Sequence, residues 1–265
     1  MSEKALLVVS FGTSYADTRK KTIEVLEKRL AGEFPDRTFY RAWTSGVIIR
    51  KLKKSGLVID TVAEAMERIR ADGCTDLLVQ PTHMLNGYEN EAMKKTIREA
   101  GGFLEKLSFG APLLNSPEDL ACIKKAVQTR FSFLKDTEAL VLMGHGSPEQ
   151  GNEVYEKMRR SFADASPSIF LGTVEAVPDF NDVLQDIEKK KPSRICLAPF
   201  LIVAGDHASN DLAGAEPDSW KSRLEALGYE TEAVLEGLGE YKAVQELLVL
   251  HAKEARAEQQ MTGCK

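Results

Sequence analysis

The chain has 265 residues, of which 43% are hydrophobic and 28% are charged, and its formal net charge is −5 at pH 7. This composition is that of an ordinary globular protein and excludes a long disordered segment. An acidic chain without a broad basic stripe is not typical of a nucleic-acid-binding protein, and no apolar run approaches the length of a membrane span.

Along the chain, short apolar segments alternate with longer amphipathic segments, a pattern typical of a mostly parallel sheet covered by helices. The predicted strands are residues 4–10, 37–43, 75–82, 103–109, 138–144, 168–174, 193–200 and 230–235. The predicted helices are residues 16–33, 46–54, 61–72, 89–101, 117–133, 150–164, 179–190, 217–228 and 239–257. We expect Asp60 to cap the helix after it, and Ser116 to cap the helix that begins at Pro117.

The second half of the chain repeats the first. Three pairs of segments match: ALLVVSFGTS at 5–14 with ALVLMGHGSP at 139–148, FYRAWTSG at 39–46 with IFLGTVEA at 169–176, and DLLVQPTHMLNGYEN at 76–90 with RICLAPFLIVAGDHA at 194–208. In each pair an apolar strand runs into a turn, and the order of the pairs is the same in both copies. An internal repeat of this kind indicates one structural unit used twice.

We therefore predict an α/β fold of two similar parallel-sheet halves related by internal duplication. The N-terminal half is residues 1–135 and the C-terminal half is residues 136–265, with the boundary in a polar stretch that begins at Lys135. Ligands of open α/β sheets bind at the carboxyl ends of the strands. We expect a cleft between the two halves at those ends.

Only the second copy carries residues that bind metals. The matched positions are Phe11 with His145, Ser45 with Glu175, and Glu89 with His207. Taken singly, a histidine at a strand end more often only caps the strand, and a carboxylate before a turn is more often solvated. Their coincidence at three equivalent strand ends favours a metal site. Two neutral imidazoles and one carboxylate suit a divalent first-row metal and leave coordination positions open.

Several neighbouring side chains have two interpretations that stay open. Asp206 is either a partner of His207 or a helix cap. His83 either faces the cleft or is a hydrogen-bonded core residue. Glu89 is either a proton acceptor or outer metal contact, or a first-turn glutamate favoured by the helix dipole. The turn from Ser10 to Thr13 offers hydroxyl groups to an anion, although it lacks the known phosphate-binding motifs.

A short basic cluster consists of Arg50, Lys51, Lys53 and Lys54. It is either a solvated helix face or an anion-binding surface. The four cysteines form no CxxC pair, which argues against a thiolate zinc site or a redox dithiol. The N-terminal residues resemble a first strand rather than a signal peptide, so we expect a cytoplasmic protein.

Several motifs together resemble the anaerobic cobalt chelatases of cobalamin synthesis, the sirohydrochlorin cobaltochelatase family CbiK. They are ALLVVSFGTSY, RAWTSGVIIRKL, MGHGS, VEAVP, LIVAGDHASND and DSWK, and the similarity runs nearly end to end. The resemblance implies a ferrochelatase-like (class II chelatase) fold with a tetrapyrrole between two similar domains. It also implies insertion of Co²⁺ with release of two pyrrole protons, metal ligands at His145, Glu175 and His207, and His145 as the base.

The resemblance also gives roles to residues of the first copy. Sirohydrochlorin is rich in carboxylates, so an acidic protein needs local cations such as Arg50, Lys53 and Lys54. The other expected substrate contacts are Ser10, Phe11, Thr13, Ser45 and His83, with Phe11 packing on the ring and Glu89 accepting a proton or guiding the metal.

The expected partners are a tetrapyrrole and a divalent metal, without nucleic acid or membrane and with no cofactor beyond the substrate metal. A homo-oligomer stays open. Three alternatives also stay open: insertion of Fe²⁺ or Ni²⁺ into the same substrate, a tetrapyrrole or metal carrier without turnover, and a zinc or dinuclear hydrolase.

Overall fold

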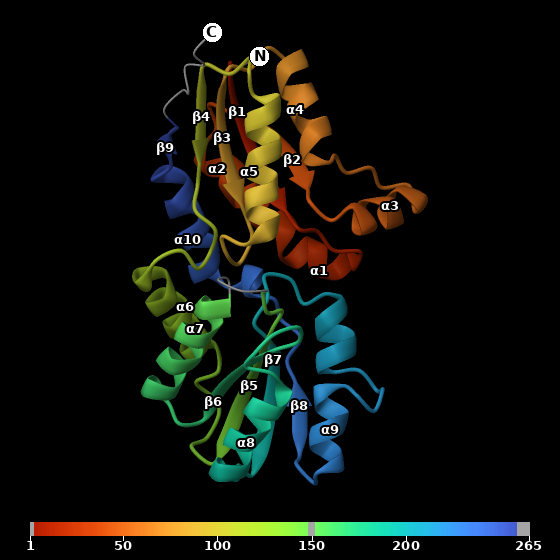
Figure 1. Cartoon of the computed structure of the whole chain (residues 1–265), viewed down its shortest axis with the longest axis vertical. Helices are drawn as coiled ribbons and strands as arrows, with labels where there is room; N and C mark the ends of the chain where they lie inside the picture. Colours follow the sequence, from red (N-terminus) through yellow and green to blue (C-terminus); the bar gives the residue numbers. More distant parts are fainter. Residues whose placement is uncertain (1–2, 148–151, 259–265) are drawn as a thin grey trace. The chain divides into compact units, whose positions relative to one another are not determined.

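The computed structural model describes residues 3–147 and 152–258, which form two compact units (Figure 1). Among these residues, the first unit contains 3–14, 23–113 and 245–258, and the second contains 15–22, 114–147 and 152–244. Each unit has its own sheet. No helix in the described part of the chain has both the length and the apolar character that a membrane span requires.

The sheet of the first unit has the strand order β2-β1-β3-β4-β9. Its parallel strands are β1 (Lys4–Ser10), β2 (Thr38–Trp43), β3 (Asp76–Pro81) and β4 (Lys106–Phe109). The short β9 (Arg256–Ala257) joins β4 in the antiparallel sense. The sheet of the second unit contains β5 (Glu138–Gly144), β6 (Ile169–Thr173), β7 (Arg194–Pro199) and β8 (Thr231–Ala233), all parallel, in the order β6-β5-β7-β8.

The two sheets have the same order and the same register. Val9 of β1 lies opposite Pro81 of β3, and the matched Met143 of β5 lies opposite Pro199 of β7. This confirms the predicted fold class of two similar parallel-sheet α/β halves.

Helices cover both faces of the first sheet, which is why its central strands β1 and β3 are almost continuously buried. The helices of this unit are α2 (Ile23–Glu33), α3 (Gly46–Lys54), α4 (Val62–Ala71), α5 (Tyr88–Ala100) and most of α10 (Lys242–Lys253). Alternate residues of β1 point to opposite faces. Leu7 packs with residues of α4 and α5, whereas Leu6 packs with residues of α2 and α10. Helix α3 stands apart from the sheet and buries only Leu52 (Figure 1).

The second unit is built in the same way. Its helical segments are α1 (Ala16–Lys21), α6 (Pro117–Arg130), α7 (Asn152–Ala165), α8 (Phe180–Lys190), the π-turn η2 (Ala208–Leu212), α9 (Trp220–Ala226) and the 3₁₀ turn η3 (Leu238–Glu240). Val141 and Leu197 of the sheet share one apolar cluster with Phe180 of α8 and with Trp220 and Leu224 of α9.

The observed division differs from the predicted boundary near residue 135. Helix α6 lies in the second unit, and α10 returns to the first, where Val249 and Ala252 fill the face of the sheet that Leu6 also lines. The predicted single helix at 16–33 is two helices, because the backbone leaves helical geometry at Thr22 (φ −116°, ψ −82°), where the chain passes from one unit to the other. The cleft expected between the halves stays a prediction.

Two helices begin at or near the capping residues that the sequence predicts. Ser116 caps α6 as predicted, with its side chain accepting a hydrogen bond from the Asp119 backbone. The prediction for Asp60 was wrong, because Thr61 is the capping residue of α4 and forms a reciprocal capping box with Glu64.

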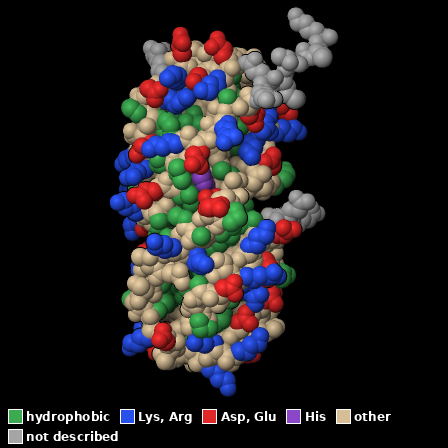
Figure 2. All heavy atoms as spheres, turned by 90° about the vertical axis from the view of Figure 1, so that its left-hand side faces the viewer, with side chains coloured by type: hydrophobic (Ala, Val, Ile, Leu, Met, Phe, Trp, Pro, Cys, Tyr) green, Lys and Arg blue, Asp and Glu red, His purple; other side chains and the backbone are tan. Residues whose placement is uncertain are grey.

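The surface in Figure 2 mixes acidic and basic side chains. No single-sign stripe covers this face, so it lacks the electrostatic footprint of a nucleic-acid-binding surface.

Candidate metal centre

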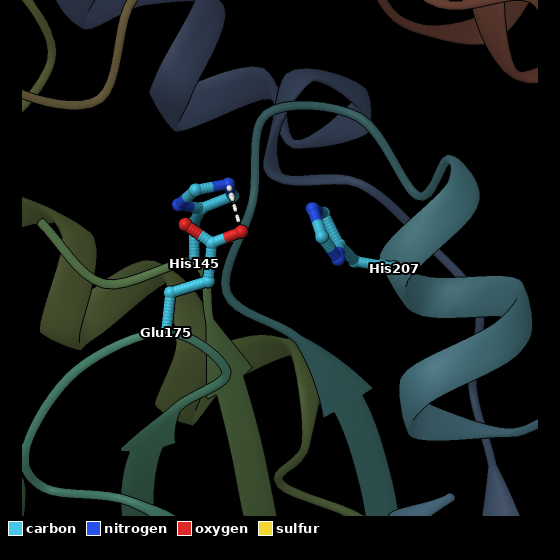
Figure 3. Close-up of side chains that lie close together, drawn as sticks. All are labelled: His145, Glu175 and His207. Atoms are coloured by element: carbon cyan, nitrogen blue, oxygen red, sulfur yellow. Dashed lines mark ion pairs between the residues drawn. The ribbon is translucent and has the colours of Figure 1, made fainter.

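Three side chains of the second unit converge at the carboxyl edge of its sheet (Figure 3). His145 directly follows β5, Glu175 lies two residues beyond β6, and His207 lies in the helical turn after β7, directly before η2. Each offers a ligand atom, and these atoms all lie within 4.8 Å of one another. Within the described residues, this is the one such group of histidine, cysteine and acidic side chains.

The geometry of the group suits a metal ion. His145 Nε2 lies 3.6 Å from Glu175 Oε1, and the imidazole rings of His145 and His207 are 4.8 Å apart at 85°. The side chains are 43%, 58% and 34% exposed for His145, Glu175 and His207, respectively. A site so open to solvent can take up a metal and release it again.

A tight turn holds Glu175 beside His145. The Glu175 N–H donates to the His145 carbonyl over 2.9 Å. Gly146 has φ +92°, and a Cβ placed on it would lie 2.9 Å from the Ala176 Cβ. Only glycine therefore fits between the two ligand-bearing turns. The Thr173 hydroxyl donates to the Ala176 carbonyl over 2.6 Å and closes the turn from the other side.

Both imidazoles are held through Nδ1. His145 Nδ1 lies 3.1 Å from the Gly146 carbonyl oxygen, and His207 Nδ1 lies 2.7 Å from Asp211 Oδ2. A carbonyl or carboxylate oxygen only accepts, so Nδ1 carries the hydrogen in each ring. Both histidines then present the Nε2 lone pair as the ligand atom.

The turn that carries His207 is held in place by Tyr15, the residue before α1, and by Thr18 of α1. The Tyr15 hydroxyl donates to Asp206 Oδ1 over 3.1 Å, and the Thr18 hydroxyl donates to the Ala204 carbonyl over 3.3 Å. Desolvation, together with the Asp206 carboxylate, raises the pKa of Tyr15. Asp206 is therefore occupied by Tyr15, and the partner of the His207 ring is Asp211. Neither Tyr15 nor Asp211 was identified from the sequence, although the four-residue spacing from His207 to Asp211 on a helical turn was a usable signal.

The first unit has the same backbone arrangement as the candidate metal centre but different side chains at the matched positions. The Ser45 N–H donates to the Phe11 carbonyl over 3.2 Å, as Glu175 does to His145. Phe11 is 47% exposed, Ser45 caps α3, and Glu89 lies in the first turn of α5. The Glu91 N–H donates to the Gly87 carbonyl as the Ser209 N–H does to Gly205, so the third pair is also equivalent in backbone. A phenylalanine, a serine and a glutamate take the places of the three candidate ligands.

The other predicted substrate contacts of the first unit are buried. Ser10 and Thr13 are 1% and 3% exposed, and the Thr82 hydroxyl donates to Ser10 Oγ over 2.9 Å. In contrast, Arg50, Lys51, Lys53 and Lys54 all lie exposed on α3. Their roles toward a substrate stay predictions.

His83 is buried, and only one of its two ring nitrogens has a hydrogen-bond partner. Nδ1 lies 3.4 Å from Asn90 Oδ1, whereas Nε2 has no hydrogen-bond partner. The Asn90 amide nitrogen donates to Asn86 Oδ1, which leaves Asn90 Oδ1 to accept from the imidazole. Burial lowers the pKa of His83 to about 4, so the ring is neutral at neutral pH. Its Nε2 is a hydrogen-bond acceptor and a poor base.

The chain matches the family model "Cobalt chelatase (CbiK)" over residues 4–257. It is 37% identical over 254 residues to the sirohydrochlorin cobaltochelatase of Salmonella typhimurium, covering 96% of each chain. It is 29% identical over 259 residues to sirohydrochlorin cobaltochelatase CbiKC of Nitratidesulfovibrio vulgaris, covering 96% of this chain and 91% of the relative.

Solved structures agree on the fold. SirB from Bacillus subtilis with Fe³⁺ superposes with a TM-score of 0.63 at 13% identity, covering 96% of this chain and 95% of SirB. CbiX, described as the terminal enzyme of siroheme biosynthesis in denitrifying bacteria, superposes with a TM-score of 0.59 at 18% identity, covering 94% of this chain and 98% of CbiX. At these identities the likeness establishes the architecture alone.

Proposed function

Because the chain belongs to the cobalt chelatase (CbiK) family, we propose that it inserts Co²⁺ into sirohydrochlorin. The observation that carries the proposal is the convergence of His145, Glu175 and His207 within 4.8 Å at one sheet edge. Both curated relatives are named sirohydrochlorin cobaltochelatases and match this chain almost end to end.

The ligand set fits a metal that is held only to be handed over. Two imidazoles and one carboxylate fill part of the coordination sphere and leave positions for ring nitrogens. The ion is a substrate here, so firm but incomplete coordination is what transfer requires. Nitrogen and oxygen ligands of this kind also accept Fe²⁺ and Ni²⁺, and the donor set by itself does not select cobalt.

Insertion also requires removal of two pyrrole protons. An imidazole or a carboxylate near the ring accepts protons near neutral pH. We assign this task to His145, whose Nε2 becomes available as the metal leaves, and to Glu89 as a second acceptor or guide for the metal. His83 is unsuited to the task because burial lowers its pKa to about 4.

The first unit is proposed to bind the macrocycle. The exposed ring of Phe11 offers an apolar face for the tetrapyrrole. The exposed cations of α3 offer charge-assisted hydrogen bonds to the carboxylates of the substrate. Ser10, Thr13 and Ser45 are proposed to add polar groups at the same sheet edge, and His83 is proposed to offer its unpaired Nε2 as an acceptor to a donor of the substrate.

A multiple-turnover assay tests the proposal. Purified protein is mixed with excess sirohydrochlorin and Co²⁺, Fe²⁺ or Ni²⁺ in parallel, and the visible absorption of the tetrapyrrole is followed. An enzyme yields many equivalents of product per chain. A yield of at most one equivalent per chain would identify a carrier. Faster turnover with Fe²⁺ or Ni²⁺ would show that one of these ions, and not Co²⁺, is the metal substrate. If no metal is inserted, the hydrolase is the alternative that remains.

A further inference from the structure

The two histidines of the metal centre are supported in different ways. The Nδ1 of His145 is held by a neutral backbone carbonyl, that of Gly146. The Nδ1 of His207 is held at 2.7 Å by a carboxylate, Asp211, which lies four residues further along, on the π-turn η2.

The contact with Asp211 fixes both the tautomer and the direction of the His207 ring. An ionised carboxylate accepts only, so the hydrogen of the neutral imidazole is on Nδ1 and the lone pair is on Nε2. Figure 3 shows the His207 ring extending from its helical turn toward Glu175 and His145. A carboxylate behind a ligating imidazole also strengthens it as a donor, because the negative charge stabilises electron donation to the metal.

The matched position in the first unit carries no carboxylate. The residue four positions after Glu89, the counterpart of His207, is Met93, which is 2% exposed and packs in the core of the first unit. The side chain of Asp211 is 43% exposed and has no packing role of that kind. The other neighbouring aspartate, Asp206, accepts from Tyr15 instead.

We propose that Asp211 is a positioning residue that holds the His207 imidazole in its Nδ1–H tautomer and thereby sets the affinity of the centre for Co²⁺. This inference rests on the proposed function of the His145, Glu175 and His207 group as the Co²⁺ site. Asp211 acts through His207 and is not itself a ligand, since its carboxylate is engaged on the far nitrogen of the ring.

The first test measures Co²⁺ binding without tetrapyrrole, by titration calorimetry on the full chain. Asp211→Ala is expected to weaken binding by about 10- to 100-fold, the usual cost of losing such a partner. Asp211→Asn should lose less, because its amide oxygen still accepts from Nδ1. The matched control is Asp218→Asn, which removes an exposed carboxylate seven residues away and should leave binding unchanged.

The second test reads the tautomer directly by ¹⁵N NMR of the His207 ring in metal-free protein, at a pH where free imidazoles are neutral. The wild-type ring should carry its proton on Nδ1, and Asp211→Ala should show a mixture of tautomers. A residue that only stabilised the fold would not produce this change.

Several outcomes would overturn the inference: an Nε2–H tautomer in the wild type, unchanged Co²⁺ affinity in Asp211→Ala, or equal losses in Asp211→Ala and Asp218→Asn. The variant His207→Ala distinguishes a wrong role for Asp211 from a wrong location of the metal site. If His207→Ala loses Co²⁺ and Asp211→Ala does not, only the positioning role fails. If His207→Ala binds Co²⁺ as the wild type does, the metal site itself lies elsewhere.

Discussion

At the scale of single residues, the metal centre depends on how tightly two turns are brought together. His145 and Glu175 follow neighbouring strands, and the backbone hydrogen bond between them leaves room for only a glycine at position 146. A ligand set of three side chains tolerates little displacement, because coordination distances are fixed to within a few tenths of an ångström. Small changes in the geometry of the turn should therefore alter metal affinity.

Gly146→Ala is expected to lower both stability and Co²⁺ affinity. The alanine adopts a left-handed φ at a cost of about 1–2 kcal/mol, and its Cβ pushes Ala176 and with it the Glu175 turn. Gly228→Ala is the matched control, since Gly228 has φ +89° and nothing within 4 Å of an added Cβ. Thermal melts should show similar losses from strain in both variants, with a further loss for Gly146→Ala, and calorimetry should show weaker Co²⁺ binding for Gly146→Ala alone. Equal Co²⁺ affinities would show that the turn has no influence on the ligands.

Removal of a ligand should abolish insertion without unfolding the chain. His145→Ala and His207→Ala each delete a partly exposed side chain at a sheet edge, so the apolar core stays intact. Circular dichroism should match the wild type, while Co²⁺ insertion falls below detection.

Glu89→Gln should instead slow insertion at saturating substrate and keep Co²⁺ affinity, because Glu89 acts on the transfer of the metal into the ring. Full activity in both histidine variants would place the site elsewhere, and lost Co²⁺ affinity in Glu89→Gln would make Glu89 a ligand.

His83 should make the fold sensitive to mild acid. Its pKa is about 4 in the folded chain and 6.5 in the unfolded chain. Between these two pH values the imidazole is protonated in the unfolded chain but stays neutral in the folded chain. Stability conferred by the neutral ring is present above pH 6.5 and is lost as the pH falls toward 4, by an amount on the order of 3 kcal/mol. Urea unfolding across this range should show a smaller loss for His83→Phe than for the wild type. Identical pH dependence in the two proteins would mean that the burial of His83 has no such cost.

At the scale of elements, α3 differs from the other helices of the first unit. It buries only Leu52 and presents Arg50, Lys51, Lys53 and Lys54 to solvent. Its place after β2 matches the Glu175 turn after β6 in the second unit, so the same position in the two copies carries a cationic helix in one and a metal ligand in the other.

Lys53→Glu combined with Lys54→Glu should raise the KM for sirohydrochlorin by about tenfold, since exposed ion pairs contribute up to ~1 kcal/mol each. The kcat should change little, because the lost contacts are made equally in the ground state and the transition state. Lys189→Glu combined with Lys190→Glu is the control, since this pair also lies in the last turn of a helix. An unchanged KM in the α3 variant at low ionic strength would show that the cluster is a solvated helix face.

At the scale of the whole molecule, duplication has produced two units with one backbone and different chemistry. The first sheet edge carries Phe11, Ser45 and Glu89, and the second carries the three ligands in matched positions. Within the described residues there is one candidate set of metal ligands, so we expect metal binding in the second unit. Binding energy then stabilises that unit directly.

Hydrogen exchange should localise this effect. Co²⁺ at about 100 times its Kd contributes about 2.7 kcal/mol to the state that binds it, and protection should rise in β5, β6, β7 and η2. Amides of β1 to β4 serve as the internal reference and should change less, and chelation of the metal should reverse the effect. Protection that rose in the first sheet alone would contradict the assignment of the ligands to the second unit.

The sequence by itself determined the eight main strands, the duplication and the three side chains that converge at one sheet edge, whereas β9 lies within a predicted helix. Strand periodicity and burial are local properties, so β5 was predicted with its observed bounds, and the match of His145 to Phe11 is repeated in the backbone hydrogen bonds. Tertiary structure alone decided which segments exchange between the units, because α10 is placed by the apolar face that it fills in the first unit. It also decided that Asp211, and not the adjacent Asp206, holds His207, since the choice depends on Tyr15, which is 191 positions from Asp206 in the sequence. Contacts between distant segments have no signature in local composition, and for that reason only the folded chain shows them.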